Sequence, residues 1–398
     1  MSTIFCDPWV LRQGIRSVLW FHYPDCLDHR FGGYRLNRDA CDGHVYDDRH
    51  KHLVGTCRMI YTFCVGARIG GPDWCRSAAA HGLAFLFDAF WDADREGFDW
   101  TLEGADTADA TRYCYGHAFA VLACAAATEL DLPGTADRLE QASRVLDERF
   151  FEPDYGLYRA EADADWCFAE YRGQNANMHA CEAHLAAFDA TGDADHLDRA
   201  YAVADALVRD PPTDSGLVPE HYTAEWELDF GYNRDEPRHQ FRPPGFQPGH
   251  AVEWAKLLCL LADRREENWL AERARGLFEA AVEIGWDDDY GGFFYTVEAD
   301  GTPIVPEKYG WAVAEGIGAA ALLGREDGAS LDYYDRFWEY ARTHLIEPRY
   351  GTWYEKVTRE GERIAPANDG PRVEPGYHPV TNARLAMAAL RGERPRLV

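Results

Sequence analysis

Histidine, arginine and other polar side chains recur near the starts of helical stretches that are otherwise apolar. These stretches have a 3.6-residue hydrophobic period and lie at about 49–69, 111–130, 175–191, 248–264, 309–324 and 379–392. The side chains concerned are Arg58, Tyr115, His117, Asn175, His179, His250, Glu253, Trp311, Glu315 and His378. Ionisable groups are rare in apolar helices unless they are paired or functional, so their recurrence in every stretch predicts one shared site.

The composition of this set favours proton transfer on a sugar. An imidazole has an ordinary pKa of about 6.5 and exchanges protons near neutrality. A cavity with several histidines, few carboxylates and aromatic walls therefore suits proton transfer on a polyhydroxylated carbon skeleton. In sugar isomerisation the ring opens and a proton moves between C1 and C2 through an enediol. Arg58 would stabilise the charge that develops on oxygen, while Asn175 and Glu315 would hold hydroxyl groups.

The same residues could serve a metal, but their spacing argues against it. His250 and Glu253 share one helix face, which suits either a metal pair or a glutamate that orients an imidazole. No H-E-x-x-H motif and no Cys/His ligand spacing accompanies them, so orientation is the preferred interpretation and no metal is expected. The run 287–289 is interpreted as an acidic turn rather than a calcium loop. Gly316 and Gly318 fall inside a helix, so they predict no dinucleotide site.

A recurring turn divides the chain into units. A glycine next to an aromatic, branched or hydroxyl residue occurs at positions 33, 97, 156, 216, 292 and 351. The spacings are 64, 59, 60, 76 and 59 residues, which gives six units of about 60 residues. Six such units fill the sequence, so we expect a single catalytic domain over residues 1–398.

Each unit also contains a more highly charged helical stretch before the apolar one. These stretches lie at about 7–21, 73–90, 134–150, 194–209, 267–285 and 331–346. Twelve helices in six pairs, with no long strand-rich block, predict an all-α fold: an (α/α)6 barrel, which is a closed double ring of helices. The apolar stretches should form the inner ring and the charged stretches the outer wall.

The loops within a unit are long and lead to the start of an inner helix. Some should form short β-hairpins at one end of the barrel, as at 293–301. The longest loop, about 210–248, contains Trp226, Tyr232 and Arg242 and several prolines. Loops of this length are usually functional, so this one is expected to cover a pocket.

The charge balance excludes several classes of partner. Forty Lys and Arg stand against 68 Asp and Glu, a formal net charge of −28, and only four of the basic residues are lysines. This charge repels nucleic-acid phosphates and anionic lipids, so neither nucleic acid nor a membrane is an expected partner. Abundant acid with few lysines is typical of a halophilic protein in a salt-loaded cytoplasm, although an ordinary acidic protein is the alternative.

The cysteines and the N-terminus favour a cytoplasmic location. The 11 cysteines are scattered without a C-x-x-C motif, which does not suit a disulfide framework or a zinc ribbon. The first residues have no signal-peptide pattern, and no apolar run approaches the ~20 residues of a transmembrane helix. We therefore expect a reduced, soluble, cytoplasmic protein. Its oligomeric state is left open, with a homo-oligomer possible.

Four motifs together resemble one known family. They are EYRGQNANMHA at 170–180 followed by Glu182, PGHAVEW at 248–254, Trp311 with Glu315, and Tyr377 with His378. Their order is similar to that in the N-acylglucosamine 2-epimerase superfamily, and within it to the bacterial aldose–ketose isomerases that act on mannose or sulfoquinovose. The resemblance runs from about Arg58 to His378. It implies an (α/α)6 barrel that needs no metal or cofactor.

The resemblance also implies roles for individual residues. His250 and His378 would be the acid/base pair, one serving ring opening and the other the proton transfer between C1 and C2. The resemblance does not assign the two steps to individual histidines. The positions that match the family's substrate pocket are Arg58, Tyr115, Asn175, His179, Glu253, Trp311 and Glu315. His117 and Arg242 complete the set of expected substrate-binding residues.

Two departures from the sulfosugar branch bear on the substrate. Glu374 stands where that branch carries a Gln, and Gln240 stands where it carries an Arg, although Arg242 is retained. A carboxylate in place of an amide would oppose a sulfonate, so a neutral hexose of the mannose/fructose type is preferred. A sugar 2-epimerase remains open because it can use the same two histidines. A glycoside hydrolase, with Glu253 and Glu315 as its carboxylates, and a non-catalytic sugar-binding protein are the further alternatives.

Overall fold

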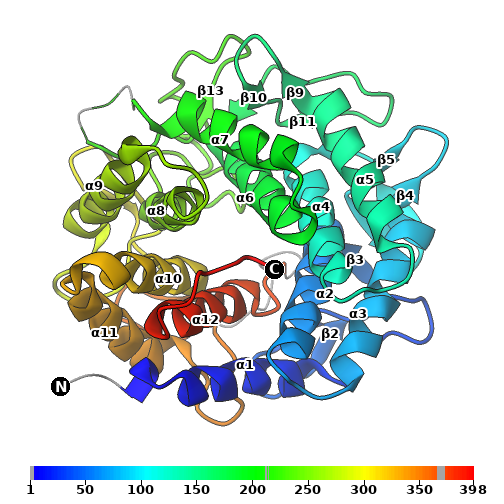
Figure 1. Cartoon of the computed structure of the whole chain (residues 1–398), viewed down its shortest axis with the longest axis horizontal. Coiled ribbons are helices and arrows are strands. Elements are labelled where there is room, and N and C mark those ends of the chain that lie inside the picture. The colour runs from blue at the N-terminus through cyan, green and yellow to red at the C-terminus, as the bar shows by residue number, and fades with distance from the viewer. Residues whose placement is uncertain (1–3, 211–212, 214, 365–372) are drawn as a thin grey trace.

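Helices arranged in two concentric rings build the molecule (Figure 1). The computed structural model describes residues 4–210, 213, 215–364 and 373–398. Within these residues the α-helices are α1 (Pro8–His22), α2 (Leu53–Arg68), α3 (Trp74–Phe85), α4 (Cys114–Thr128), α5 (Thr135–Val145), α6 (Gln174–Thr191), α7 (Ala194–Val208), α8 (Pro248–Ala262), α9 (Asn268–Gly285), α10 (Gly310–Asp327), α11 (Ser330–Tyr340) and α12 (Tyr377–Leu390). The prediction of an (α/α)6 barrel with twelve helices is confirmed.

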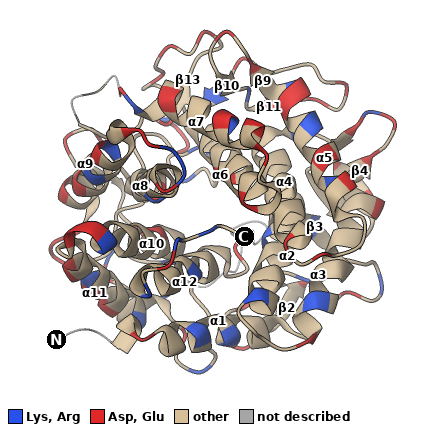
Figure 2. Cartoon of the chain, viewed as in Figure 1, with Lys and Arg blue, Asp and Glu red and all other residues tan. Residues whose placement is uncertain are grey.

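The even-numbered helices form the inner ring, as their low charge predicted. Nearly every residue of α2, α4, α6, α8, α10 and α12 is buried. The odd-numbered helices bury only one face, and charged residues cover their outer side (Figure 2). The inner helices pack against one another in sequence, and α12 packs against both α1 and α2. That last contact closes the ring.

Local sequence sets where these helices begin and end. Pro8 and Pro248 stand in the first turns of α1 and α8, where a proline costs no hydrogen bond. Gly192 ends α6 with a left-handed φ of 73°, a conformation that glycine adopts without strain. Three outer helices end in a π-helical turn, at Leu86–Phe90, Leu146–Phe150 and Ala341–Leu345.

Short antiparallel strands lie in the connections that lead into the inner helices. They are β1 (Asn37–Arg38), β2 (Val45–Asp47), β3 (His50–His52), β4 (Trp91–Asp92), β5 (Gly97–Phe98), β6 (Thr101–Glu103), β7 (Asp106–Asp109), β8 (Arg112–Tyr113), β9 (Phe151–Glu152), β10 (Leu157–Tyr158), β11 (Glu161–Ala162), β12 (Arg172–Gly173), β13 (His221–Tyr222), β14 (Thr296–Val297), β15 (Pro303–Val305), β16 (Lys308–Tyr309) and β17 (Lys356–Val357). The expected hairpins are therefore present, and β14 pairs with β15 close to the stretch predicted for one of them. Residues 211, 212 and 214 of the long loop lie outside the described residues.

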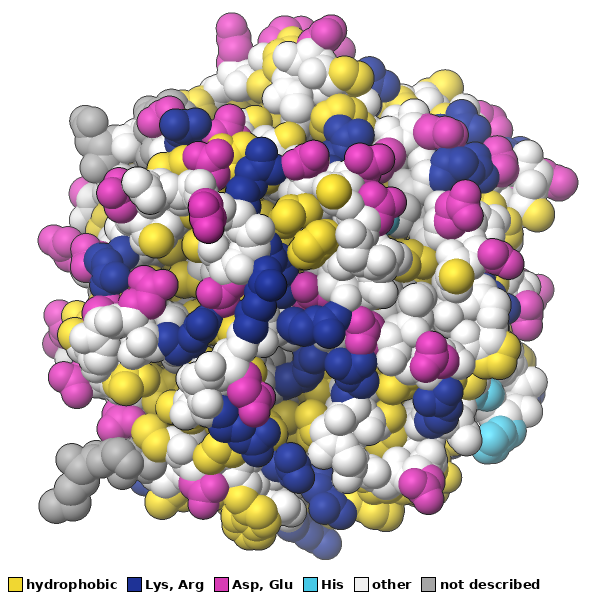
Figure 3. Space-filling model, in the orientation of Figure 1, with side chains coloured by type: hydrophobic (Ala, Val, Ile, Leu, Met, Phe, Trp, Pro, Cys, Tyr) yellow, Lys and Arg dark blue, Asp and Glu magenta, His cyan; other side chains and the backbone are white. Residues whose placement is uncertain are grey.

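The barrel end opposite the hairpins is the one where the inner helices finish, and the C-terminal segment crosses it (Figure 1). Its Leu397 accepts a hydrogen bond from Tyr61 of α2 through its carbonyl, and its backbone N–H donates to Asp189 of α6. Lys and Arg side chains form a band across this end (Figure 3). Arg264 beside Asp189 and Arg396 beside Glu129 show that carboxylates partly neutralise this end.

None of the helices within the described residues has the length and apolar character that crossing a bilayer requires.

A close approach of two inner helices provides a test of the fold. A Cβ atom on Gly318 of α10 would lie 1.8 Å from Oδ1 of Asn382 of α12. We expect Gly318→Ala to lower the free energy of unfolding by about 1–3 kcal/mol because the helices must shift apart.

Gly276 of the outer helix α9 provides the matched control, since the nearest atom to its added Cβ lies 4.0 Å away. Gly276→Ala should leave the protein unchanged or stabilise it by up to about 1 kcal/mol, because alanine favours a helix. Urea denaturation of both variants measures the difference. Equal effects would contradict the close packing at Gly318.

Candidate active site

A cavity lies at the end of the barrel where the inner helices begin. Side chains from the inner helices and from the loops that precede them form its wall. The lining residues are Arg58, Tyr115, Asn175, His179, Gln240, Phe241, Gln247, His250, Glu253, Tyr295, Tyr309, Trp311, Glu355, Val373, Glu374 and His378. Eight of the eleven residues predicted for the site are therefore in one wall.

His378 is held as a neutral imidazole with a defined tautomer. Its Nδ1 lies 2.6 Å from Oε1 of Glu315, and a carboxylate in this position accepts the Nδ1 proton. Its Nε2 lies 3.1 Å from Nη2 of Arg58, which can only donate, so Nε2 is the acceptor. Burial, together with the positive charges of Arg58 and Lys256, holds the pKa of His378 well below its usual value. In this tautomer His378 can act as a base through the lone pair on Nε2.

His250 has its own carboxylate partner. Its Nδ1 lies 2.9 Å from Oε2 of Glu220, and that oxygen also accepts a hydrogen bond from Gln174 at 2.9 Å. Gln174 in turn is fixed by Trp254, whose indole N–H donates to Oε1 of Gln174 at 2.8 Å. Burial alone would raise the pKa of Glu220, but His250 and these hydrogen bonds hold it below its usual value. The arrangement leaves Nε2 of His250 for a substrate.

Both imidazoles lie beside the same indole ring. The centre of the Trp311 ring lies 5.2 Å from that of His250 and 5.7 Å from that of His378. Histidines separated by 128 positions in the sequence therefore meet across one side chain of the same cavity wall. The indole also supplies a flat apolar surface of the kind that stacks on the face of a sugar.

Arg58 is the basic side chain of this wall. Its guanidinium donates to Tyr115 at 3.0 Å and to the backbone carbonyl of Val373 at 3.2 Å, and it lies 3.4 Å from a carboxylate oxygen of Glu374. Burial would lower the pKa of Arg58, but the surrounding hydroxyl and carboxylate groups raise it above its usual value. Arg58 is thus a fixed positive charge beside Nε2 of His378.

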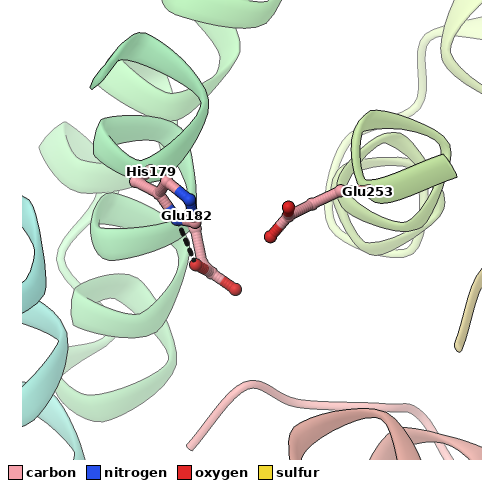
Figure 4. Close-up of side chains that lie close together, drawn as sticks. All are labelled: His179, Glu182 and Glu253. Atoms are coloured by element: carbon pink, nitrogen blue, oxygen red, sulfur yellow. Dashed lines mark hydrogen bonds and ion pairs between the residues drawn. The ribbon is translucent and has the colours of Figure 1, made fainter. Parts of the chain in front are cut away.

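A second layer of charge lies beneath the cavity. The Lys256 ammonium is 2.5 Å from Glu315, 3.5 Å from Glu182 and 3.5 Å from Glu253, and all four side chains are fully buried. Ligand-type atoms of His179, Glu182 and Glu253 lie within 4.8 Å of one another, and His179 is hydrogen-bonded to Glu182 (Figure 4). A small cation could be held by such a group. The ammonium of Lys256 already supplies the positive charge at this point.

Two carboxyl groups of the wall are poorly ionised. Burial and the neighbouring charge of Glu315 hold the pKa of Glu253 well above its usual value. Burial also raises the pKa of Glu374 to about 7. Glu253 is consequently a neutral acid that can donate a hydrogen bond, and Glu374 changes charge near neutral pH.

Three predicted site residues lie outside the cavity wall. His117 is buried between the backbone of Phe98 and the carbonyl of Tyr113, where it forms part of the packing. Arg242 lies in the neighbouring pocket and is paired with Glu161 at 2.5 Å. Glu315 lies below the wall and reaches the site only through His378.

Several residues that shape the site were not predicted from the sequence. Glu220 lies on the long loop, and no pattern in the sequence connects it with His250. Tyr295 comes from the loop before β14 and reaches the wall only because the chain folds back. Lys256 did carry a signal, because a lysine in the apolar run AVEWAKLLCLLA must be paired if that run is an inner helix.

The chain belongs to the N-acylglucosamine 2-epimerase family, whose sequence description, N-acylglucosamine 2-epimerase (GlcNAc 2-epimerase), matches residues 32–381. It is 37% identical over 373 residues to a D-mannose isomerase of Marinomonas mediterranea, which covers 92% of this chain and 94% of the relative. It is 38% identical over 315 residues to a D-mannose isomerase of Thermobifida fusca, with 77% of each chain covered. A crystal structure of D-mannose isomerase superposes with a TM-score of 0.93 at 36% identity, covering 97% of this chain and 99% of that one.

The ionisation of Glu374 predicts a pH-dependent stability. Because its pKa is about 7 in the folded protein and about 4.5 otherwise, the folded state binds a proton that the unfolded chain has released between these values. The stability that this proton contributes is lost as the pH rises through 7. Glu374→Gln stays neutral at every pH. Its free energy of unfolding should therefore rise relative to that of the wild type by about 2 kcal/mol between pH 5 and pH 8.

Urea denaturation at the two pH values measures this change. Glu393→Gln, at an exposed position, is the control. Its free energy of unfolding should depend on pH as that of the wild type does. If Glu374→Gln also followed the wild-type curve, the carboxyl group would not be held neutral in the fold.

Proposed function

We propose that the protein is an isomerase that interconverts an aldose and a ketose, with mannose and fructose as the pair. The main support is that His250 and His378 line one cavity and both lie beside the ring of Trp311. The relatives named D-mannose isomerase, which match most of the chain, support the same reaction.

The reaction has two proton-transfer stages, ring opening and isomerisation, and the cavity has two imidazoles for them. In ring opening, a base takes the proton of the C1 hydroxyl while an acid protonates the ring oxygen, which gives the open aldehyde. In isomerisation, a base takes the proton from C2 and returns it to C1, and a proton moves from the oxygen on C2 to the oxygen on C1. Aldose and ketose have the same composition, so no proton is gained or lost overall. His250 and His378 divide these steps between them.

Fixed positive charge near the reacting carbons stabilises the enediol intermediate. Arg58 lies beside Nε2 of His378, where negative charge would develop on the oxygens of C1 and C2. The N-terminal ends of α4, α6, α8, α10 and α12 converge on the same cavity, and the partial positive charge of each helix start adds to this effect. The neutral carboxyl of Glu253 can donate a hydrogen bond to a substrate hydroxyl.

The charge of the wall favours a neutral hexose. Among the described residues that line the cavity, Arg58 is the basic side chain, and it is already engaged by Tyr115 and Glu374. Arg242, which could bind an anionic group, is paired with Glu161 outside this wall. A sulfonate or phosphate on C6 would therefore meet no unengaged arginine or lysine among the described residues of this wall.

Incubation of the purified protein with single sugars in deuterated water tests the proposal. Mannose and fructose should interconvert, with deuterium entering at C1 or C2, in the presence of a chelator. Mannose 6-phosphate should be converted at least about 100-fold less efficiently, because its charge is unmatched. Formation of glucose from mannose without fructose would indicate a 2-epimerase, and cleavage of cellobiose would indicate a hydrolase. Either outcome would replace the proposal.

Substitution of either imidazole should abolish turnover without unfolding the protein. We expect His250→Ala and His378→Ala to lower kcat at least about 1,000-fold, because each removes a proton-transfer group. The matched control is His184→Ala, since His184 is a buried histidine of the inner helix α6 that binds Tyr158 away from the cavity. Its kcat should stay within a few-fold of the wild type. Wild-type turnover in either of the first two variants would contradict their role.

A further inference from the structure

The lysines of this chain are placed unusually. The sequence has four of them among 40 basic residues, so arginine is the ordinary choice for a positive charge here. Lys51, Lys256 and Lys308 are all buried, with exposed fractions of 2%, 0% and 0%. At these three enclosed positions lysine supplies a compact ammonium, a point charge, in place of a planar guanidinium.

Lys256 differs from the other buried lysines in the number of carboxylates around it. Lys51 lies 2.5 Å from Asp28 and Lys308 lies 2.9 Å from Asp287, and neither lysine is a lining residue of the cavity. Lys256 instead faces Glu182 of α6, Glu253 of its own helix α8 and Glu315 of α10. Carboxylates from three inner helices therefore meet at one ammonium. Of these, Glu253 lines the cavity, and Glu315 is hydrogen-bonded to His378, which also lines it.

We propose that Lys256 is a positioning residue of the isomerase: its ammonium keeps Glu315 ionised, and Glu315 in turn holds His378 with its proton on Nδ1 and its lone pair on Nε2. This inference rests on the proposed function. Lys256 is not among the lining residues of the cavity, so its effect on the substrate is indirect, and the route proposed here runs through Glu315 and His378.

The geometry around Glu315 supports the ionised form. Its Oε1 accepts from Asn382 at 2.8 Å and from His378 at 2.6 Å, while its Oε2 faces Lys256 at 2.5 Å. Burial raises the pKa of Glu315 above its usual value, and the Lys256 ammonium and the Asn382 amide act against that rise because both stabilise the ionised carboxylate. Glu253 has only Lys256 as an ionic partner on its own helix, at 3.5 Å, and is the group that takes the proton.

The network also sets the charge that His378 experiences. Besides Lys256, the titratable and charged groups that face His378 are Glu315 of α10, Glu253 of α8, Arg58 of α2, His179 and Glu182 of α6, and Glu374 of the segment before α12. The positive charges of Arg58 and Lys256 oppose protonation of the imidazole, while the carboxylates favour it. His378 and Glu315 share a hydrogen bond and titrate as a pair, so loss of the Lys256 charge raises the pKa of that pair, and the added proton blocks Nε2 of His378 at higher pH.

This consequence separates a positioning role from a purely structural one. A lysine that only fills a buried space would change stability and the amount of active enzyme, but it would leave the pH dependence of the reaction in place. A lysine that sets the state of His378 must move that dependence. The acid limb of the kcat/KM profile, where His378 becomes protonated, is the quantity to compare.

Three variants measure the effect with mannose as the substrate. Lys256→Met removes the charge and keeps the length of the side chain. Lys256→Arg keeps the charge and alters the shape. Lys51→Met is the control, because it removes an equally buried lysine with an ion pair of the same 2.5 Å length in β3.

We expect Lys256→Met to lower kcat about 10- to 100-fold, the usual effect of removing a partner that orients a ligand-binding group, and to move the acid limb upward by about one pH unit or more. Lys256→Arg should keep the limb within a few tenths of a unit of the wild type, even if kcat falls. Lys51→Met should keep both kcat and the limb. A wild-type limb in Lys256→Met, or an equal shift in Lys51→Met, would overturn the proposal.

A measurement on the wild-type protein covers the case in which Lys256→Met does not fold. NMR of protein labelled at its histidines and glutamates reports which nitrogen of His378 carries the proton and whether Glu315 is ionised. The proposal requires a proton on Nδ1 and an ionised Glu315 at pH 7, and a protonated Glu315 would overturn it. These signals do not depend on turnover. If the wild type failed to convert mannose while the signals were as required, the proposed function alone would fail.

Discussion

The ion pair between Lys256 and Glu315 joins α8 to α10 in a part of the molecule from which water is excluded. A buried charge without a partner costs several kcal/mol, so the two side chains must stay paired and the neighbouring groups must adapt their positions and ionisation to them. Glu315 is fixed by the pair and fixes His378 in turn. The surplus of carboxylates over cations leaves Glu253 protonated. The charge state of the cavity wall thus follows from a contact that no substrate touches.

The fold follows from periodicity that is visible in the sequence. The alternation of charged and apolar helical stretches predicted the two rings, and the observed bounds of the inner helices agree to within a few residues. This succeeded because an inner helix must be apolar on nearly all sides, whereas an outer helix needs only one apolar stripe. Where the glycine spacing lengthens to 76 residues, the long loop between α7 and α8 accounts for the difference.

The site was predictable only where it depends on helix starts. His250, Trp311 and His378 stand in the first or second turn of an inner helix, so the ring topology alone brings them together. His117 also stands near a helix start, but its side chain turns toward the β5 segment, and neither composition nor spacing reveals the direction of a side chain. Glu220 comes from a loop, and its pairing with His250 depends on a chain path that has no sequence signature.

The proposed mechanism requires two imidazoles to act on one hexose. A structure of the protein with bound mannitol, an open-chain analogue of both sugars, is the direct test. We expect ring nitrogens of His250 and His378 both to lie within about 3.5 Å of the oxygens or carbons at C1 and C2, with Arg58 beside the same oxygens. A bound polyol that contacts only one of the two imidazoles, or that lies outside the wall around Trp311, would contradict it.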